Sequence, residues 1–232
     1  MSYINSTRDV ACYGWIGDKW EDLQLVLFAD ANKGEKPTFN STSGAFLCLS
    51  GPNSFFPLAA LSKKQTSIAH STPEAEIVSV DTALKNLGVP SLSLWDHIMG
   101  HGSRKLEAIL KEDNEAAIRV LSAGRNPTMR HMQRTQGISL SWIWERFERK
   151  EFELDKCPTR EMSADIFTKP FTDKTTWTHA RKLIGHYLPE ELGLSAVKAK
   201  SVIAPVVRLN DGMTISPQHS RIIIEYCCGP ES

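Results

Sequence analysis

The chain has 232 residues, and its 27 Lys and Arg are balanced by 27 Asp and Glu, so the formal net charge is zero. This balance argues against a strongly basic protein that coats nucleic acid, although a local basic patch remains possible. The length can bury a sizeable core and fits one domain of roughly 150 residues with appendages better than two full domains.

Neither a disulfide framework nor a membrane anchor is expected. The five cysteines are odd in number and lack a CxxC or Cys/His ligand spacing, which argues against disulfides and against a zinc site. The N-terminus lacks the apolar core of a signal peptide, and no apolar run approaches about 18 residues. We therefore expect an intracellular protein, cytoplasmic or nuclear and not secreted, with no membrane partner and with reduced thiols.

The first expected core element is a central strand. Residues 1–20 carry several aromatic side chains but too little else to form a domain, and they look like the end of an upstream segment. Residues 23–28 are apolar on both faces, which is typical of a strand inside a sheet that is covered on both sides. Asp30 follows at the carboxyl end of this strand, where open α/β sheets tend to place ligands. The alternative is an ordinary aspartate that starts a turn.

Two turns then separate two more strands. Turn-forming residues at 40–44 and 51–53 bound a strand at about 45–50, and another strand follows at about 55–61. Consecutive hairpins would make these three strands antiparallel. Pro57 cannot donate a hydrogen bond to a neighbouring strand, so it predicts an edge position or a bulge for the third strand.

A helix with a carboxylate on its inner face follows. Ser71 and Glu74 have the spacing of a capping box, which begins the helix at Ser71 or the next residue. At about 100° per residue, Glu76 falls on the apolar face, whereas Glu74 falls on the opposite face, toward solvent. The apolar face is formed by Val80, Ala83 and Leu87. A carboxylate there is costly unless it is paired, protonated or bound to a metal. The alternative for Glu76 is a boundary residue that reaches solvent.

The second half of the chain changes to β-α-β order. Residues 106–111 predict a fourth strand that runs into Asp113, and residues 114–121 predict a short helix. Asp113 could instead be the cap of that helix. A polar loop is expected at 122–137.

The remaining pattern predicts a helix, a strand and two further helices. Apolar residues at helical spacing mark the first of these helices: Leu140, Ile143, Trp144 and Phe147. A half-exposed strand at 151–157 precedes a last core helix at 160–169, which Thr159 can cap and which carries Asp165 near its apolar side. The alternative for Asp165 is a solvated helix charge. Another helix is expected at 174–187, and a strand at 222–226 has no evident place.

Four acidic residues stand out by their positions after strands and on inner helix faces: Asp30, Glu76, Asp113 and Asp165. A mixed sheet can bring all four to one edge. Clustered carboxylates repel one another unless a cation neutralises them, and an all-oxygen site suits Mg²⁺ or Mn²⁺. Two such ions about 4 Å apart can hold the attacking and leaving oxygens of a phosphodiester displacement. The four acids together therefore predict a nuclease.

Several short motifs, in order along the chain, resemble the ribonuclease H domain of copia-type retrotransposon Pol polyproteins. These motifs are PheAlaAspAlaAsn at 28–32, AsnSerThrSerGly at 40–44, SerLysLysGln at 62–65, SerThrProGluAlaGlu at 71–76, GluAspAsnGluAlaAla at 112–117 and AlaAspIlePheThrLysPro at 164–170. The family places its catalytic glutamate at the second Glu of GluAlaGlu, which is Glu76, in agreement with the helical-face argument. Asn32 departs from the second aspartate that is usual in the family.

The resemblance implies the ribonuclease H fold, an α/β fold whose five-stranded mixed sheet has three antiparallel strands and then β-α-β order, flanked by helices. It implies hydrolysis of the RNA strand of RNA:DNA hybrids with two Mg²⁺ or Mn²⁺ ions, and Asp30, Glu76, Asp113 and Asp165 as catalytic metal ligands. Partners would be the hybrid and the reverse transcriptase and integrase regions of a parent polyprotein.

The resemblance also suggests how the chain is divided. Residues 1–20 resemble the end of the reverse transcriptase connection region, and residues 21–170 would form the ribonuclease H-like domain. Residues 171–194 would be a C-terminal helical extension and residues 195–232 a loosely ordered tail.

Basic residues in two loops are the candidates for contact with nucleic-acid phosphates. Lys63 and Lys64 come first, with Arg130 and Arg134 behind them, and the alternative is a solvated loop. The competing function is a catalytically inactive remnant that serves as a nucleic-acid-binding or structural module. Retention of all four acids favours the enzyme.

Overall fold

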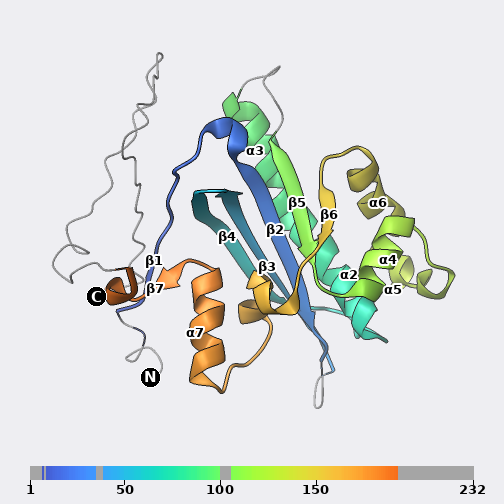
Figure 1. The fold of residues 1–232 in the computed structure, drawn as a ribbon. Coiled ribbons are helices and arrows are strands. Elements are labelled where there is room, and N and C mark those ends of the chain that lie inside the picture. Colours follow the sequence, from blue (N-terminus) through green and yellow to red (C-terminus); the bar gives the residue numbers. More distant parts are fainter. Residues whose placement is uncertain (1–6, 8, 35–38, 100–105, 193–232) are drawn as a thin grey trace, which may run out of the picture.

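The computed structural model describes residues 7, 9–34, 39–99 and 106–192 (Figure 1), so the predicted tail at 195–232 and the strand at 222–226 lie outside the described residues. A five-stranded mixed sheet in the order β4-β3-β2-β5-β6 forms the centre. Its strands are β2 (Gln24–Asn32), β3 (Thr42–Gly51), β4 (Ser54–Lys64), β5 (Glu107–Glu112) and β6 (Glu153–Lys156).

The strand directions are those that the sequence predicted. β3 is antiparallel to β2 and to β4, whereas β5 is parallel to β2 and to β6. The predicted α/β class is confirmed, with three antiparallel strands followed by β-α-β order, which is the sheet of the ribonuclease H fold. β2 lies at the centre, as its apolar faces required.

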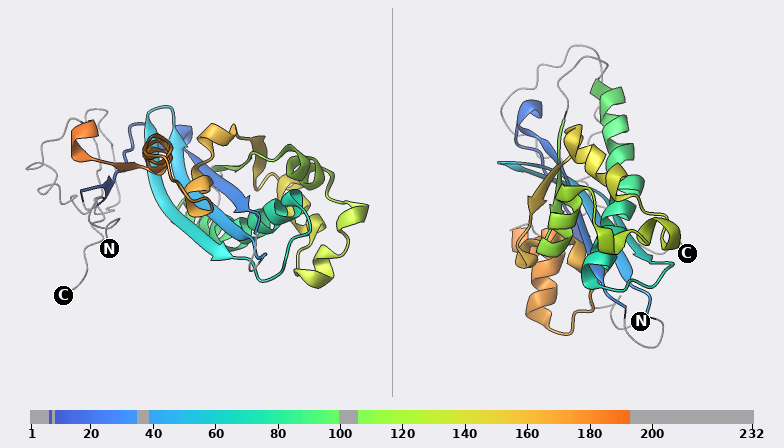
Figure 2. Two further views of the ribbon diagram at one scale, coloured as in Figure 1. Left: turned by 90° about the horizontal axis from the view of Figure 1, so that it is seen from below. Right: turned by 90° about the vertical axis from the view of Figure 1, so that its right-hand side faces the viewer.

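Helices cover both faces of the sheet (Figure 2). On one face lies a continuous helical run of α2 (Thr72–Ala83), the π-helical turn η2 (Leu84–Gly88) and α3 (Val89–Met99). The same face is covered by α4 (Glu115–Ala123) and α6 (Leu140–Glu148), and the short α5 (Met132–Thr135) lies between them in sequence. None of the helices in the described part of the chain has the length and apolar character that a membrane span requires.

The two faces of β2 enter two different cores. Leu25 and Leu27 pack into the main core with Ile77 of α2. Val26 packs into a smaller core on the other face, together with Ile184. Two elements contribute to this core: the 3-10 helix η5 (Ser163–Phe167) and the end of α7 (Lys174–Leu183). Alternate side chains of β2 are therefore buried on opposite faces, as the continuous apolar run predicted.

Pro57 has the position that the sequence predicted for it. β4 is an edge strand, and its register with β3 shifts where Leu47 pairs with Ala59 and Cys48 pairs with Pro57. One residue is left over on β4 between these pairs, which is a β-bulge. Both expectations, edge position and bulge, are confirmed.

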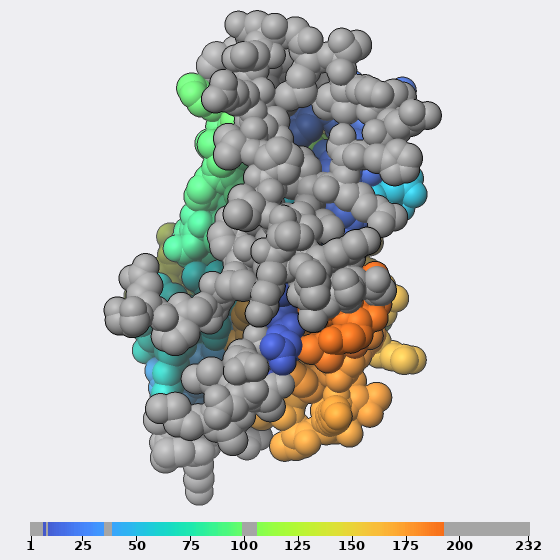
Figure 3. All heavy atoms as spheres, turned by 90° about the vertical axis from the view of Figure 1, so that its left-hand side faces the viewer, coloured from blue at the N-terminus to red at the C-terminus, as the bar shows by residue number. Residues whose placement is uncertain are grey.

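The segment before β2 packs onto the rest of the protein. β1 (Ala11–Cys12) pairs antiparallel with β7 (His186–Tyr187), and Trp15 and Phe55 exchange backbone hydrogen bonds of 2.7 and 2.9 Å. Figure 3 shows the blue N-terminal residues against the orange C-terminal elements. The short 3-10 helices η1 (Trp20–Asp22) and η6 (Pro189–Leu192) belong to the same two segments. The described residues of segments 1–20 and 171–194 thus contact one another, and the division of these segments into separate units stays a prediction.

Residues 160–169 do not form the predicted α-helix. Two 3-10 segments, η4 (Thr159–Glu161) and η5, take its place, and Thr159 caps neither. Helical pattern is only a weak indication in such a segment, and tertiary packing can override it. Burial of Met162 and Ala164 beside Cys157 sets its path instead.

Other boundaries shift for similar reasons. The predicted loop at 122–137 contains η3 (Pro127–Met129) and α5, because Met132 is fully buried in the main core. In the predicted stripe of α6, Ile143 is fully buried but Trp144 is 36% exposed. The predicted helix at 174–187 ends at Leu183, since the chain turns there into β7.

Gly124→Ala should lower the free energy of unfolding more than Gly137→Ala. Both glycines have positive φ, 66° and 70°, where an L side chain costs about 1–2 kcal/mol. A Cβ on Gly124 would lie 2.5 Å from Cγ of Trp144, whereas a Cβ on Gly137 would meet nothing within 4 Å. Urea denaturation measures the difference. Equal destabilisation in the two variants would contradict the close packing of Trp144 on this turn.

Candidate metal-binding active site

Asp30 lies near the carboxyl end of β2 and is 1% exposed. Its carboxylate accepts a hydrogen bond from the hydroxyl of Thr168, and Nζ of Lys169 lies 3.3 Å from its Oδ1. Its backbone oxygen accepts a hydrogen bond of 2.6 Å from Oγ of Ser79 on α2. Asp30 is therefore a fixed, buried charge within the sheet and not the exposed turn residue of the alternative interpretation.

Glu76 reaches this strand end from α2. The helix begins at Thr72, and Oγ of its N-cap Ser71 accepts a hydrogen bond from the backbone N–H of Glu74, as the capping spacing predicted. Glu76 is 4% exposed, and its Oε2 accepts a hydrogen bond of 2.7 Å from the backbone N–H of Ala31. The predicted inward orientation of Glu76 is confirmed, and the boundary alternative is wrong.

Asp113 completes a group of three acids. Ligand oxygens of Asp30, Glu76 and Asp113 all lie within 4.8 Å of one another. Asp113 follows β5 directly, and Asn114, not Asp113, caps α4 through hydrogen bonds to the N–H groups of Ala116 and Ala117. Three carboxylates this close, two of them buried, are the donor set that Mg²⁺ and Mn²⁺ prefer.

Asp165 lies beside this group and is linked to it by a lysine. Nζ of Lys169 lies 2.6 Å from Oδ1 of Asp165 and 3.3 Å from Oδ1 of Asp30. The ammonium thus offsets part of the repulsion between these two carboxylates. The structure brings three of the four predicted acids within 4.8 Å of one another and places the fourth across Lys169 from Asp30.

Sequence reasoning missed a fifth acid, Glu112, which is fully buried. Its Oε1 accepts a hydrogen bond of 3.1 Å from the backbone N–H of Asn114, and its Oε2 is buried without a hydrogen-bond partner among the described residues. The alternation of β5, in which Ala108, Leu110 and Glu112 share one buried face, was the signal that could have identified it.

Burial raises the pKa of three of these carboxyl groups, Glu76, Glu112 and Asp165. It raises the pKa of Glu76 far above its ordinary value, and the charges of Glu112 and Asp30 raise it further. Burial also raises the pKa of Glu112. The pKa of Asp165 is raised to about 6, first by burial, while the hydrogen bond from Lys169 acts in the opposite direction. A bound cation would favour the ionised form of the whole group.

Glu74 does not face solvent as predicted, because it is 1% exposed. Its Oε2 accepts a hydrogen bond of 3.0 Å from the backbone N–H of His70. Its Oε1 lies 3.2 Å from Nε2 of His131 and also accepts a hydrogen bond from the side chain of Gln136. Glu74 does lie on the outer side of α2, as the helical period predicted, but the segment around α5 covers that side.

The four predicted phosphate-binding residues are all exposed. Lys63 and Lys64 belong to the last residues of β4 and not to the predicted loop, because β4 continues its pairing with β3 to Lys64. This strand end lies next to η5, since Oγ of Ser62 donates a hydrogen bond of 2.7 Å to the backbone oxygen of Phe167. Arg134 lies in α5, and Arg130 lies just before it, at the end of η3. Contact of these residues with nucleic acid stays a prediction.

No family model and no curated protein matches this chain. Among solved structures, it is similar to a ribonuclease H1 isolated from compost by a metagenomic approach, at 15% identity, covering 62% of this chain and 92% of that one with a TM-score of 0.43. The N-terminal ribonuclease H domain of a Mycobacterium tuberculosis protein is similar at 14% identity, 69% and 97% coverage and a TM-score of 0.41.

A third similar structure is the ribonuclease H domain of prototype foamy virus, at 15% identity, 70% and 92% coverage and a TM-score of 0.40.

Without metal, the protein should lose stability as the pH rises. The folded-state pKa values of Glu76, Glu112 and Asp165 are raised, that of Asp165 to about 6. Above the ordinary carboxyl pKa of about 4, the folded state therefore binds more protons than the unfolded chain, so the free energy of unfolding falls as pH rises from about 4 through 6 and beyond. Thermal melts in EDTA at several pH values measure this slope.

Glu76→Gln should flatten the slope, because an amide does not titrate, and Mg²⁺ should raise the melting temperature of the unaltered protein most at the higher pH. A slope that is the same in Glu76→Gln would contradict the buried carboxylate cluster as its cause.

Proposed function

We propose that this chain is a metal-dependent endoribonuclease that hydrolyses the RNA strand of RNA:DNA hybrids. The observation that supports this most is the convergence of Asp30, Glu76 and Asp113, which come from a strand, a helix and a strand end far apart in the sequence. Burying such charges together is costly, so a site with this composition is expected to serve a cation.

We propose two Mg²⁺ or Mn²⁺ ions, with Asp30, Glu76, Asp113 and Asp165 as their ligands. When bound, the ions would supply an activated water and stabilise the leaving 3′-oxygen of an in-line displacement. The chain's own residues hold the acids in place for this. Asp30 is fixed by the hydroxyl of Thr168, and Glu76 by the N–H of Ala31.

Lys169 partly neutralises the acidic site in the absence of metal. Its ammonium lies between Asp30 and Asp165 and is a single positive charge among several carboxylates. Lys169 thus stabilises the acids in the protein without metal, and the remaining negative charge is left for the ions to neutralise.

The hybrid as substrate is supported by the placement of basic side chains. Lys63 and Lys64 extend from the strand end that is hydrogen-bonded to η5, and η5 carries Asp165. On the copia-type resemblance, we further propose that the chain is part of, or derived from, a retrotransposon polyprotein with reverse transcriptase and integrase regions.

The purified chain should cut the RNA strand of a labelled hybrid in Mg²⁺ or Mn²⁺ and spare single-stranded RNA and duplex DNA. Glu76→Gln keeps the shape and removes one charge, so cleavage and metal affinity should fall together by about 100-fold or more. The matched control is Glu153→Gln, an exposed glutamate at the beginning of β6, which should cut normally. Absence of cleavage by the well-folded, unaltered protein would favour the inactive remnant.

Removing both basic residues at the end of β4 should weaken hybrid binding and reduce its salt dependence. Lys63→Ala and Lys64→Ala should each reduce the slope of log K against log salt by about 0.9 at most, because one lysine neutralises at most one phosphate. Fluorescence anisotropy across a salt series without divalent metal measures this slope. Lys19→Ala, at the opposite end of β2, is the control and should leave the slope unchanged. An unchanged slope in the double variant would mean that neither lysine contacts a phosphate of the hybrid.

A further inference from the structure

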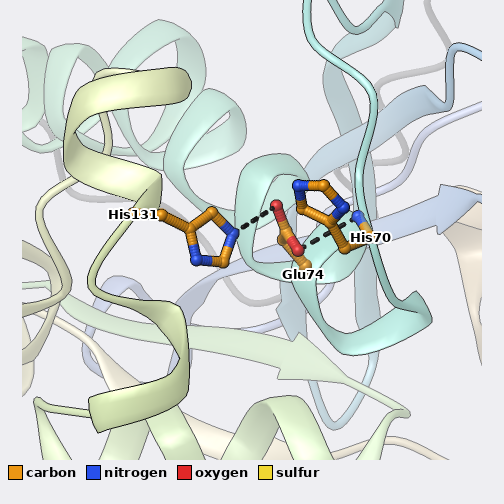
Figure 4. A group of neighbouring side chains, drawn as sticks. All are labelled: His70, Glu74 and His131. Carbon is orange, nitrogen blue, oxygen red and sulfur yellow. Dashed lines mark hydrogen bonds and ion pairs between the residues drawn. The ribbon is translucent and has the colours of Figure 1, made fainter.

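A second group of metal-binding side chains lies on the outer side of α2. His70, Glu74 and His131 each offer a ligand atom, and these atoms lie within 4.8 Å of one another. Figure 4 shows the two imidazole rings on either side of the Glu74 carboxylate. The ring centroids are 5.2 Å apart, and the rings are nearly perpendicular, at 75°. Glu74 is buried, His131 is half-buried and His70 is exposed, so an ion could enter from solvent.

The spacing of the Glu74 and His131 ligand atoms fits a small cation. Nε2 of His131 lies 3.2 Å from Oε1 of Glu74. Two ligand atoms at a tetrahedral angle on zinc, with bonds of about 2.0–2.2 Å, would lie about 3.4 Å apart. A metal can therefore replace this hydrogen bond with little movement of either side chain.

The surroundings of Glu74 support a metal ligand better than a closed hydrogen-bond network. Its carboxylate is oriented by the backbone N–H of His70 and by the side chain of Gln136, as carboxylate ligands usually are. The ring of His70 is exposed to solvent, and Oε1 of Gln136 is buried without a hydrogen-bond partner among the described residues. A buried polar group beside the carboxylate is thus left without a partner in the protein.

We propose that His70, Glu74 and His131 bind Zn²⁺, with a fourth position open to water. Two imidazoles and one carboxylate suit zinc, whereas the all-oxygen group of Asp30, Glu76 and Asp113 suits Mg²⁺. The cysteine spacing that argued against zinc does not involve these residues. No short motif marks the site in the sequence, because His131 lies 57 residues from Glu74 in the chain.

The ion would join three separate segments. His70 lies in the loop before α2, Glu74 lies in the first turn of α2, and His131 immediately precedes α5. A hydrogen bond of 2.8 Å from Oγ of Ser67 to the backbone oxygen of Thr135 already links two of them. Zinc would therefore fix α5 against the start of the helix that carries Glu76.

The test is a zinc titration of the full chain by calorimetry, after dialysis against EDTA and in excess Mg²⁺ so that the oxygen cluster is occupied. We expect one equivalent of Zn²⁺ to bind. His70→Gln and His131→Gln should each weaken it by about 100-fold or more, since even an outer-shell partner is worth roughly 10- to 100-fold. Gln136→Ala should weaken it by about 10-fold on the same basis.

Two controls separate this site from other zinc ligands. His97→Gln, an exposed histidine of α3, and a Cys227→Ser/Cys228→Ser variant should both bind zinc normally. The absorption spectrum with Co²⁺ should show four-coordinate cobalt without thiolate bands. Normal zinc binding by a folded His70→Gln/His131→Gln variant, or no zinc binding by the unaltered protein, would overturn the proposal. Binding is measured without substrate, so either outcome leaves the nuclease proposal untouched.

Discussion

Mutual repulsion of buried carboxylates is the constraint on which this structure depends. Asp30, Glu76 and Glu112 are each at most 4% exposed. Ligand oxygens of Asp30, Glu76 and Asp113 lie within 4.8 Å of one another, and the charge of Glu112 acts on Glu76. Such charges are stable together only if protons, a lysine or metal ions neutralise them. In the protein without metal, the raised pKa values of Glu76 and Glu112 favour protonation of these groups, and Lys169 offsets part of the charge of Asp30.

The fold supplies rigid supports for this arrangement. β2 is the central strand, with a partner on each side, and α2 is hydrogen-bonded to it at both Asp30 and Ala31. Gln65 adds a further link, because its side chain donates hydrogen bonds to Ser43 of β3 and to the backbone oxygen of Ala75. The acids are therefore held by regular elements, which lowers the cost of orienting them for a ligand.

Features that depend on a few neighbouring residues were predicted correctly from the sequence. Capping began α2 at the right residue, helical period turned Glu76 inward, and Pro57 lies at an edge bulge. Two of the errors come from packing that the helical period does not show. Glu74 was assigned to solvent because nothing in its own helix shows that residues 131–136 cover it, and residues 160–169 follow the packing of Met162 instead of a helical period. Glu112 was missed, although strand alternation alone places it inside.

The most direct test of the central claim is a crystal structure of the chain grown with Mn²⁺, read from the anomalous scattering of the metal. The account predicts an anomalous peak within bonding distance of carboxylate oxygens of Asp30, Glu76 and Asp113, and a second peak on the side of Asp165, with Lys169 moved away. Mn²⁺ bound only elsewhere, with the three carboxylates still contacting one another and Lys169 still between Asp30 and Asp165, would contradict it.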